Sequence, residues 1–309
     1  MTRLDAVRTF DATGWDAERL AEAKGSRRVT LCFPCRDEVA TIGGLVTIAR
    51  RHLVETSGLV DDLLVVDDRS VDGTASAASG AGARVVHVDE IHSTHGVGSG
   101  KGNVLWGSLL ASSGDVMVWC DGDLTSFSQL WVERLLAPLL ADDSVALVKA
   151  TYVRPTHLGG GGRTTELVAR PLLSLFAPGL AGLGQPLSGE FAGRRDVLES
   201  IPFVQGWGVE IAMLLDIASS CGLNSLAQVD LGVRHHRHRT LESLSIQAAE
   251  VMATLLSRVG RGCALDTTTL FHADGSVIPL NLNERPPVSS VRGSTGATTA
   301  PSLRHSEDR

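Results

Sequence analysis

The tripeptide Asp121–Gly122–Asp123 carries two carboxylates separated by one glycine, directly after the apolar run DVMVWC. Residues two apart face one side of an extended strand, and at a strand end that turns they can approach one centre from different angles. Carboxylate oxygens suit a hard divalent cation such as Mg²⁺ or Mn²⁺, which also takes substrate phosphates. A solvated turn is the alternative, because Asp-Gly is itself a turn signal.

Two glycine-rich stretches have the composition of anion-binding sites. GSGKGNVLW surrounds Lys101 with glycines at the start of an expected helix, and GGGGRTTE places Gly162 before Arg163, Thr164 and Thr165. Backbone N–H groups at a helix start, an ammonium group and a guanidinium fork all favour phosphate or carboxylate. Neither stretch has the Walker A spacing. The alternatives are a surface lysine and a mobile loop before a capped helix.

Two further charged features stand next to apolar patterns. Glu210 lies inside the apolar helical run GWGVEIAMLL, where a charge must be paired or used. It either contacts a substrate or forms an internal salt bridge, for which Arg163 and Arg234 are candidates.

The cluster RHHRHR (residues 234–239) ends a strand-like run. An imidazole is a borderline ligand that accepts Mn²⁺ and can complete a carboxylate site, so His236 is a candidate ligand. The alternative is a basic surface loop, and periodicity does not decide which of His235, His236 and His238 faces inward.

The first 125 residues alternate strand patterns with helical patterns. Strands are predicted in RVTLCFP (28–34), DDLLVVDDRS (61–70), ARVVHV (83–88) and DVMVWC (115–120), with helices at 37–53, 73–83 and 101–114. This order is typical of right-handed βαβ units and a parallel sheet. Ligands of such sheets bind beyond the carboxyl ends of the strands, so the acidic strand ends PCRDE, DDRSVDGT and DGD are expected at one edge.

The second half is less regular. It is predicted to contain strands at 145–154 and 226–233 and helices at 206–222 and 241–260, with another helix after the glycine loop. We divide the chain into an N-terminal extension (1–26), a first half (27–150), a second half (151–285) and a disordered tail (286–309). The tail is assigned from its Ser, Thr, Gly and Pro content.

Composition excludes several classes of protein. Hydrophobic residues make up 43% and charged residues 20% of the 309 residues, which is typical of a soluble globular protein. The formal net charge of −7 provides no basic field for nucleic acid. The N-terminus lacks the apolar region of a signal peptide, and no stretch has the continuous apolarity of a membrane span. Cys32 and Cys35 form a C-x-x-C better explained as strand-end cysteines than as a redox or zinc site, and a cytoplasmic location is expected.

Taken in order, eight segments resemble the glucosyl-3-phosphoglycerate synthases, which are retaining nucleotide-sugar transferases of the GT-A fold from actinobacteria. These segments are FPCRDEVATI, VVDDRSVDGT, GKGNVLWGSL, DGD, GGGRTTELVARPLL, QPLSGEFAGRR, GWGVEIAMLLD and LGVRHHRHR. The similarity extends from about residue 15 to 260. The front half matches many GT-A transferases, whereas GGGRTTELVARPLL and GVRHHRHR are much more specific.

The resemblance implies that residues 27–150 are the nucleotide-sugar-binding half and that residues 151–285 are the acceptor-binding and metal-completing half. It implies a donor site for a UDP-sugar. Lys101 would contact the nucleotide side of that site, and Asp121 would order the ribose and nearby donor groups. Glu210 would contact the transferred sugar. The other donor positions implied are Pro34, Cys35, Arg36, Glu38, Asp68, Ser70 and Gly122. This chain departs from the family pattern at Cys35 and Arg36, where small and aliphatic residues are expected, and at Gly122, where serine is common.

The resemblance also implies a metal site and an acceptor site. Asp123 and His236 would be the protein ligands of Mg²⁺ or Mn²⁺. Gly162, Arg163 and Thr165 match the loop that holds the phosphate and carboxylate of 3-phosphoglycerate. The remaining acceptor positions are assigned to Thr164, Arg234 and His236.

The expected reaction is glucosyl transfer from an NDP-glucose, with UDP-glucose favoured, to the 2-hydroxyl of 3-phosphoglycerate. Asp123, Lys101, Glu210 and Arg163 are the expected catalytic residues. Two alternatives stay open: a related transferase with another phosphorylated or carboxylated acceptor, and a nucleotide-sugar-binding protein without catalysis. The expected partners are the donor and a small anionic acceptor, in a homodimer with no nucleic acid and no stable membrane insertion.

Overall fold

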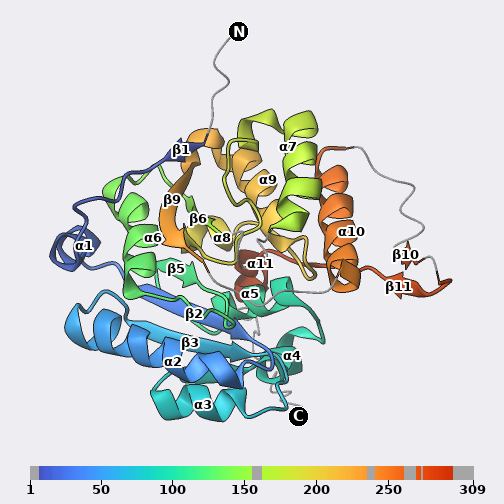
Figure 1. The fold of residues 1–309 in the computed structure, drawn as a ribbon. Coiled ribbons are helices and arrows are strands. Elements are labelled where there is room, and N and C mark those ends of the chain that lie inside the picture. The colour runs from blue at the N-terminus through green and yellow to red at the C-terminus, as the bar shows by residue number, and fades with distance from the viewer. Residues whose placement is uncertain (1–6, 155–161, 235–240, 261–268, 273, 295–309) are drawn as a thin grey trace, which may run out of the picture.

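The computed structural model describes residues 7–154, 162–234, 241–260, 269–272 and 274–294. An eight-stranded sheet runs through the molecule in the order β1-β9-β6-β7-β5-β2-β3-β4 (Figure 1). Among its described strands β7 alone is antiparallel, and it pairs with both β5 and β6. The predicted, mainly parallel α/β sheet is therefore confirmed. Its strands are β1 (Arg8–Thr9), β2 (Val29–Cys35), β3 (Asp62–Asp67), β4 (Arg84–His87), β5 (Val116–Trp119), β6 (Leu147–Val153), β7 (Phe191–Arg194) and β9 (Leu226–Val233).

Alternate residues of the central strands face two separate cores, because successive side chains of a strand point to opposite faces. In β2, Leu31 and Phe33 belong to one core and Cys32 to the other. The first core includes α1 (Ala17–Lys24), α2 (Val39–Ala49), η1 (Arg50–Thr56), α3 (Thr74–Ala81) and α6 (Gln129–Ala141). The second includes α4 (Val88–His95), α5 (Lys101–Leu110), η3 (Thr165–Ala169), α7 (Arg170–Phe176), η4 (Pro178–Leu180), α8 (Arg195–Leu198), α9 (Val209–Cys221), α10 (Leu241–Arg258) and α11 (Val288–Ser294).

The remaining elements are short. The strands β8 (Phe203–Val204) and β12 (Glu284–Arg285) pair antiparallel, and η5 (Leu223–Ser225) precedes β9. The hairpin of β10 (Thr269–Phe271) and β11 (Val277–Pro279) extends away from the main body (Figure 1). No helix in the described part of the chain combines the length and apolarity needed to cross a bilayer.

Local sequence accounts for the ends of two helices. Gly25 and Gly222 follow α1 and α9 with φ of 55° and 83°, a region that glycine enters at little cost. The elements α4, α6 and β7 were not predicted. Helix α6 is buried on most of its surface and contains Pro138, so it lacks the polar face that reveals an amphipathic helix. Strand β7 is only four residues long.

The N-terminal extension is part of the main fold rather than an appendage. Strand β1 adds to the sheet beside β9, and Leu20 of α1 is fully buried in the first core. The predicted boundary at residue 150 falls inside β6, so both predicted halves contribute strands to one sheet.

The prediction of disorder from residue 286 is wrong for residues 286–294. Trp106 Nε1 donates a 2.7 Å hydrogen bond to the Pro286 carbonyl oxygen, and Val288 in α11 is fully buried. A single apolar anchor of this kind outweighs a polar composition. Residues 295–309 lie outside the described part of the chain.

Candidate active site

Two adjoining cavities lie beyond the carboxyl ends of the central strands. The larger, of about 430 Å³, and the smaller, of about 120 Å³, share Lys101, Asp121, Asp123 and Trp207. The larger is also lined by Pro34, Cys35, Arg36, Glu38, Asp68, Ser99, Gly100, Val104, Gly122, Gly206, Glu250 and Asn281. The smaller is also lined by Tyr152, Arg154, Gly162, Arg163, Thr164, Thr165, Leu187, Gly189, Glu210, Arg234, Leu244 and Gln247. The expectation that the acidic strand ends meet at one edge is thus confirmed.

Lys101, the first residue of α5, lies between two carboxylates. Its Nζ is 2.8 Å from Asp121 Oδ1 and 2.8 Å from Glu210 Oε1. Burial works to lower the pKa of Lys101, but the charges of Asp121 and Glu210 outweigh it and raise that pKa above its ordinary value. The ammonium is therefore held charged where the two cavities meet.

Arg234, the residue after β9, lies on the other side of Asp121. One guanidinium nitrogen is 2.9 Å from Asp121 Oδ2 and 2.9 Å from Glu190 Oε1, and it is 3.8 Å from Asp123 Oδ1. Burial raises the pKa of the fully buried Glu190, although Arg234 opposes this. Asp121 is thus fixed between two cations.

These contacts identify the partner of Glu210. The sequence left open a salt bridge with Arg163 or Arg234, whereas Glu210 pairs with Lys101, and Arg234 pairs with Asp121 and Glu190. A carboxylate at the N-terminus of α9 reaches the lysine at the N-terminus of α5 because β8 brings the two helix starts together: the Gly102 and Asn103 N–H groups both donate to the Gln205 carbonyl.

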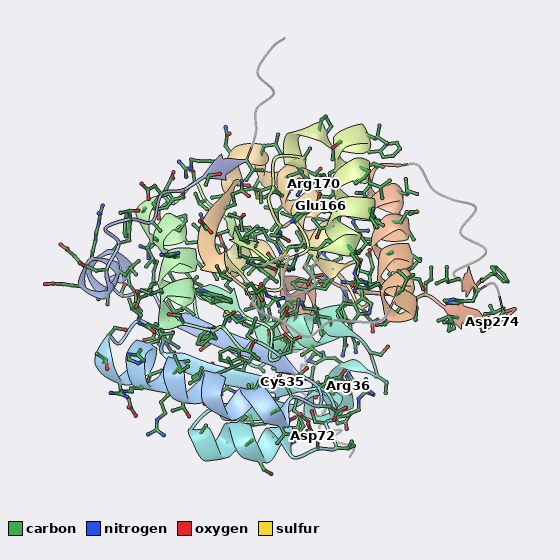
Figure 2. The ribbon with its side chains drawn as sticks, in the orientation of Figure 1. Cys35, Arg36, Asp72, Glu166, Arg170 and Asp274 are labelled. Atoms are coloured by element: carbon green, nitrogen blue, oxygen red, sulfur yellow. The ribbon has the colours of Figure 1, made fainter. Side chains whose placement is uncertain are left out.

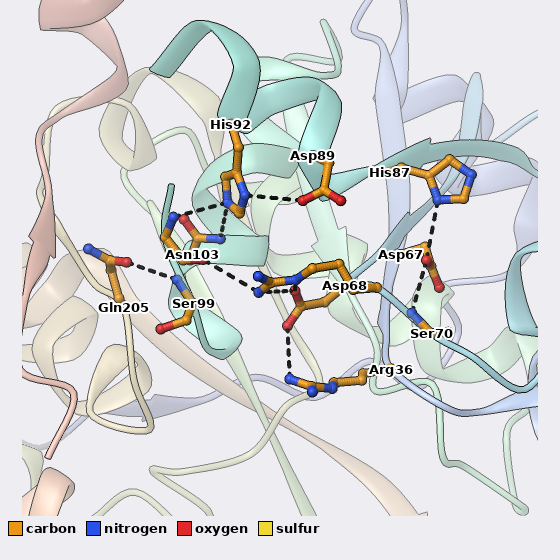
Figure 3. Close-up of polar contacts among 12 residues, drawn as sticks. Arg36, Asp67, Asp68, Ser70, His87, Asp89, His92, Ser99, Asn103 and Gln205 are labelled. Carbon is orange, nitrogen blue, oxygen red and sulfur yellow. Dashed lines mark hydrogen bonds and ion pairs between the residues drawn. The ribbon is translucent and has the colours of Figure 1, made fainter. Parts of the chain in front are cut away.

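At the far end of the larger cavity, Arg36 and Asp68 face each other. Arg36 Nη1 lies 3.8 Å from Asp68 Oδ2, while Asp68 Oδ1 accepts from Arg69 (Figure 3). Ser70 does not line the cavity; its Oγ accepts from the Asp37 N–H at 3.0 Å and so supports the turn behind Asp68. Asp37 and Arg69 have φ of 57° and 60°, which marks both turns as strained.

Cys35 and Gly122 are packed against one another. Cys35 ends β2 beside Arg36 (Figure 2) and is only 3% exposed. A Cβ at Gly122 would lie 2.6 Å from the Cys35 sulfur, so the two departures from the family pattern are physically linked. Burial raises the pKa of the thiol well above its ordinary value. Together with the equally buried Cys32 on the same strand, this favours the interpretation as strand cysteines over a redox pair.

The glycine–arginine loop forms one wall of the smaller cavity. Gly162 has φ of 77°, and the helix begins directly after it, with the Glu166 N–H donating to the Gly162 carbonyl. Arg163, Thr164 and Thr165 line the cavity. Opposite them is Arg154, which donates to Gln185 at 2.9 Å and to Tyr152 at 3.1 Å. His236, with His235 and His238, lies outside the described residues.

The residues present fit a divalent cation. Asp121, Asp123, Glu190 and Glu210 lie around Lys101 and Arg234, and carboxylate oxygens are the ligands of Mg²⁺ and Mn²⁺. The described residues include no group of three or more His, Cys, Asp or Glu side chains arranged around a metal. A metal at this site would therefore need further ligands. In the predicted site, Asp123 and His236 are joined by substrate phosphates, which would complete the coordination.

Several residues of the site were not found from the sequence. Glu250 and Asn281 line the larger cavity and stand in no recognisable motif. Glu190 and Trp207 lie in the segments QPLSGEFAGRR and GWGVEIAMLLD, but the sequence assigned them no role. Trp207 is flanked by Gly206 and Gly208, and this spacing was the one available signal of a close backbone approach.

Comparisons with known proteins agree with this geometry. The family described as glycosyl transferase family 2 matches residues 30–201. Glucosyl-3-phosphoglycerate synthase of Mycolicibacterium paratuberculosis is 42% identical over 304 residues, covering 93% of this chain and 92% of the relative. The Mycobacterium tuberculosis enzyme in complex with Mn²⁺, UDP-glucose and phosphoglyceric acid has a TM-score of 0.85 at 42% identity, covering 94% of this chain and 100% of that one. Its complex with Mn²⁺, UDP and glucosyl-3-phosphoglycerate has a TM-score of 0.84 at 42% identity, covering 93% and 100%.

Proposed function

The chain belongs to the glucosyl-3-phosphoglycerate synthases of glycosyl transferase family 2, and on this premise we propose that it transfers glucose from UDP-glucose to the 2-hydroxyl of 3-phosphoglycerate. The observation that carries the proposal is the junction of two cavities at Lys101, Asp121 and Asp123. A transferase needs a donor and an acceptor whose reacting atoms meet at one point. The relatives of known structure bind both kinds of ligand.

In this proposal the larger cavity takes the nucleotide sugar. The uracil and ribose bind near Pro34, Cys35, Arg36 and Glu38, beside Asp68. Asp121, fixed by two cations, orients the ribose and nearby donor groups. Glu210 accepts hydrogen bonds from hydroxyl groups of the glucose. The close packing of Gly122 against Cys35 supports a cavity floor that is already formed before the donor binds.

The divalent cation belongs to the donor side of the same proposal. Asp123 and His236 would hold Mn²⁺ or Mg²⁺, and a Mycobacterium tuberculosis relative has been solved with Mn²⁺ and UDP-glucose. When bound, the cation supplies electrostatic stabilisation of the diphosphate leaving group. Lys101 adds a fixed positive charge beside that group.

The smaller cavity takes the anionic acceptor. Its glycine loop and helix start offer backbone N–H groups, and Arg163 offers a fork for phosphate or carboxylate. Thr164 and Thr165 are buried beside it, and Arg234 lies at the junction with the donor. The acceptor is thereby held with its 2-hydroxyl toward the sugar, which is a contribution of positioning.

The chemistry proceeds on the front face of the donor. The bond between the glucose C1 and the β-phosphate oxygen breaks, the acceptor hydroxyl oxygen bonds to C1 from the same face, and the departing phosphate oxygen takes the hydroxyl proton. No carboxylate nucleophile is required, and both carboxylates nearest to the sugar position, Asp121 and Glu210, are already paired with Lys101. Lys101 stabilises the negative charge that develops on the leaving phosphate.

A matrix of donors and acceptors tests the function. UDP-, GDP- and ADP-glucose are each incubated with 3-phosphoglycerate, glycerol 3-phosphate, glycerate or buffer in Mn²⁺, and nucleotide release is measured. We expect release to require 3-phosphoglycerate, to be fastest with UDP-glucose and to give an α-linked product by NMR. Release with glycerol 3-phosphate but not 3-phosphoglycerate would assign another acceptor. Binding of UDP-glucose by calorimetry without any release would assign a non-catalytic protein.

We also propose that the protein is a homodimer. Leu167 of η3, Leu175 of α7 and Leu241 of α10 are each more than 70% exposed, and apolar side chains gathered on neighbouring elements commonly mark a contact surface. Light scattering measures the mass directly, and a monomer at assay concentration would contradict this part of the proposal.

A further inference from the structure

The turn Gly206–Trp207–Gly208 is pressed directly onto helix α10. A Cβ at Gly206 would lie 2.5 Å from the Asn281 carbonyl oxygen, and a Cβ at Gly208 would lie 2.7 Å from Thr254 Cβ. Only glycine allows so close an approach of the turn to its neighbours. The position of the turn therefore depends on α10 and on the segment around Asn281.

Glu250 of α10 joins these two neighbours. Its Oε2 accepts the Trp207 N–H at 2.7 Å, and its Oε1 accepts the Asn281 N–H at 2.8 Å. The residue is 3% exposed. Burial raises the pKa of Glu250, while the two backbone N–H groups work against that rise because they stabilise the carboxylate. Each oxygen of one carboxylate thus binds a different part of the chain.

Both parts of the chain line the donor cavity. Trp207 lines the larger and the smaller cavity, and Asn281 lines the larger. Asn281 Nδ2 also donates to the Ser99 carbonyl at 2.8 Å and to Ser99 Oγ at 3.2 Å. Ser99 in turn donates its N–H to Gln205, next to the same turn (Figure 3). The contacts starting at Glu250 thus end at Ser99, two residues before Lys101.

The segment after Asn281 holds the same loop at a second point. Arg285 donates to the His95 and Gly96 carbonyls at 2.8 and 2.7 Å and to Asn103 Oδ1 at 2.9 Å. The Asn103 amide contacts His92 Nε2 at 3.0 Å, and that ring atom accepts the Gly98 N–H (Figure 3). The loop 96–100 is therefore fixed at both ends, and Glu250 sets only the end next to the donor.

We propose that Glu250 is a positioning residue for the nucleotide-sugar donor, acting through Trp207 and through the contact of Asn281 with Ser99. The proposal rests on the assignment of the larger cavity to the donor. A carboxylate is needed because two N–H donors must be accepted by two oxygens of one side chain. Glutamine has one acceptor oxygen, and its NH₂ group would face the second N–H donor.

The test is Glu250→Gln. One buried backbone N–H loses its acceptor, so we expect kcat/KM for UDP-glucose to fall about 10-fold, which is the size of one lost buried hydrogen bond. The Kd for UDP, measured by calorimetry, should rise by a similar factor. KM for 3-phosphoglycerate should stay within about 2-fold, because Ser99 and Asn281 line the larger cavity and not the smaller one. A rise of both KM values by the same factor would overturn the proposal.

Glu133→Gln is the matched control. Glu133 is also a buried glutamate on a helix, 8% exposed, but it lies in α6 away from both cavities. It should change the melting temperature at most and leave the Kd for UDP as in wild type. An unchanged Kd in Glu250→Gln, with or without a lower melting temperature, would reduce Glu250 to a structural role and overturn the proposal.

A second variant covers the case in which Glu250→Gln does not fold. Asn281→Ala removes the contact with Ser99 and keeps the N–H that Glu250 accepts. It should raise the Kd for UDP and leave KM for the acceptor near wild type; no change in Kd would overturn the proposal. If wild-type protein binds UDP but forms no UDP from UDP-glucose with any acceptor, the proposed function alone is contradicted. The role of Glu250 is then still decided by comparing the Kd values for UDP of the variants and wild type.

Discussion

Replacing Lys101 with methionine removes one charge from the junction of the cavities and keeps most of the side-chain volume. The ammonium is 2.8 Å from both Asp121 Oδ1 and Glu210 Oε1, so the two oxygens are separated by at most twice that distance. Without the ammonium, two carboxylates that had shared a cation face one another. At the effective dielectric constant of about 20 that describes such sites, their repulsion is about 3 kcal/mol.

This repulsion gives the expected loss of stability. Glu210 is 4% exposed and cannot move into water, whereas Asp121 is 24% exposed and keeps Arg234 as a partner. We therefore expect the free energy of unfolding to fall by about 2 kcal/mol, less than the 3–5 kcal/mol typical of a broken, fully buried pair. The melting temperature should fall by roughly 3 °C, because an unfolding entropy of about 2.1 cal/mol/K per residue applies to all 309 residues.

The kinetic loss has a different origin. Lys101 is proposed to stabilise charge that grows on the leaving diphosphate, and loss of one such fixed group typically reduces kcat by about 10²–10³. UDP release in saturating UDP-glucose, 3-phosphoglycerate and Mn²⁺ measures this directly. The loss should appear in kcat rather than only in KM, because the interaction strengthens in the transition state.

Lys24→Met is the matched control for this experiment. Lys24 is equally buried and pairs with Asp61 at 2.8 Å, but it lies in α1 away from the cavities. It should lose stability and keep wild-type kcat. If Lys101→Met retained a kcat within about 3-fold of wild type, or if Lys24→Met lost as much, the assigned role of Lys101 would be refuted.

Three further predictions follow from the same geometry. Gly122→Ser should weaken UDP binding in calorimetry because its Cβ would lie 2.6 Å from the Cys35 sulfur, and adding Cys35→Gly should restore binding; failure of the double variant to recover would contradict the link. Burial lowers the pKa of Lys149 from 10.5 to about 8, so the unfolded state binds more protons between these values and the free energy of unfolding should rise with pH across that window, by about 3 kcal/mol at most. Urea denaturation from pH 7.5 to 10 should show this slope in wild type and not in Lys149→Met; equal slopes would argue against it. Chelation of the metal should abolish UDP release, and added Mn²⁺ should restore it. Asp123→Asn and His236→Ala should each raise the Mn²⁺ concentration for half-maximal activity at least about 10-fold. An unchanged Mn²⁺ dependence in either variant would contradict the assignment of that residue as a metal ligand.

The alternation of strands and helices in the first half was readable because it depends on local patterns. β-branched runs that end at Pro34 or at an Asp pair mark buried strands, and glycine at 25 and 222 ends helices by its left-handed backbone. Helix α6 was not predicted because it is apolar on most of its surface. Strand β7 was not predicted because four residues are too few to show a periodic pattern. The order of residues 286–294 was not predicted because the average composition of the tail does not reveal that one valine, Val288, is buried.

The candidate site was predicted as a set of residues and not as an arrangement. Asp121, Asp123, Lys101 and Arg163 stand in motifs whose chemistry is local, namely paired carboxylates and glycine-flanked cations. The pairing of Lys101 with Glu210 joins residues more than 100 positions apart, and the sequence favoured other partners for that glutamate. Glu250 and Asn281 stand in no motif, because a lone acidic or amide residue has no pattern to detect. Glu190 lies in the segment QPLSGEFAGRR, but its pairing with Arg234 could not be read from that segment.

The sequence by itself determined the chemical groups, the strand ends that carry them and the family to which the chain belongs. These follow from side-chain type and from spacing along the chain, which act over a few residues. Only the tertiary structure decided which charges pair, since a salt bridge depends on distances in space that the sheet order β7-β5-β2 sets. It also decided that Gly122 and Cys35 occupy one volume and that Glu250 holds two backbone segments at the donor cavity, because packing in a folded core is settled by shape rather than by sequence order.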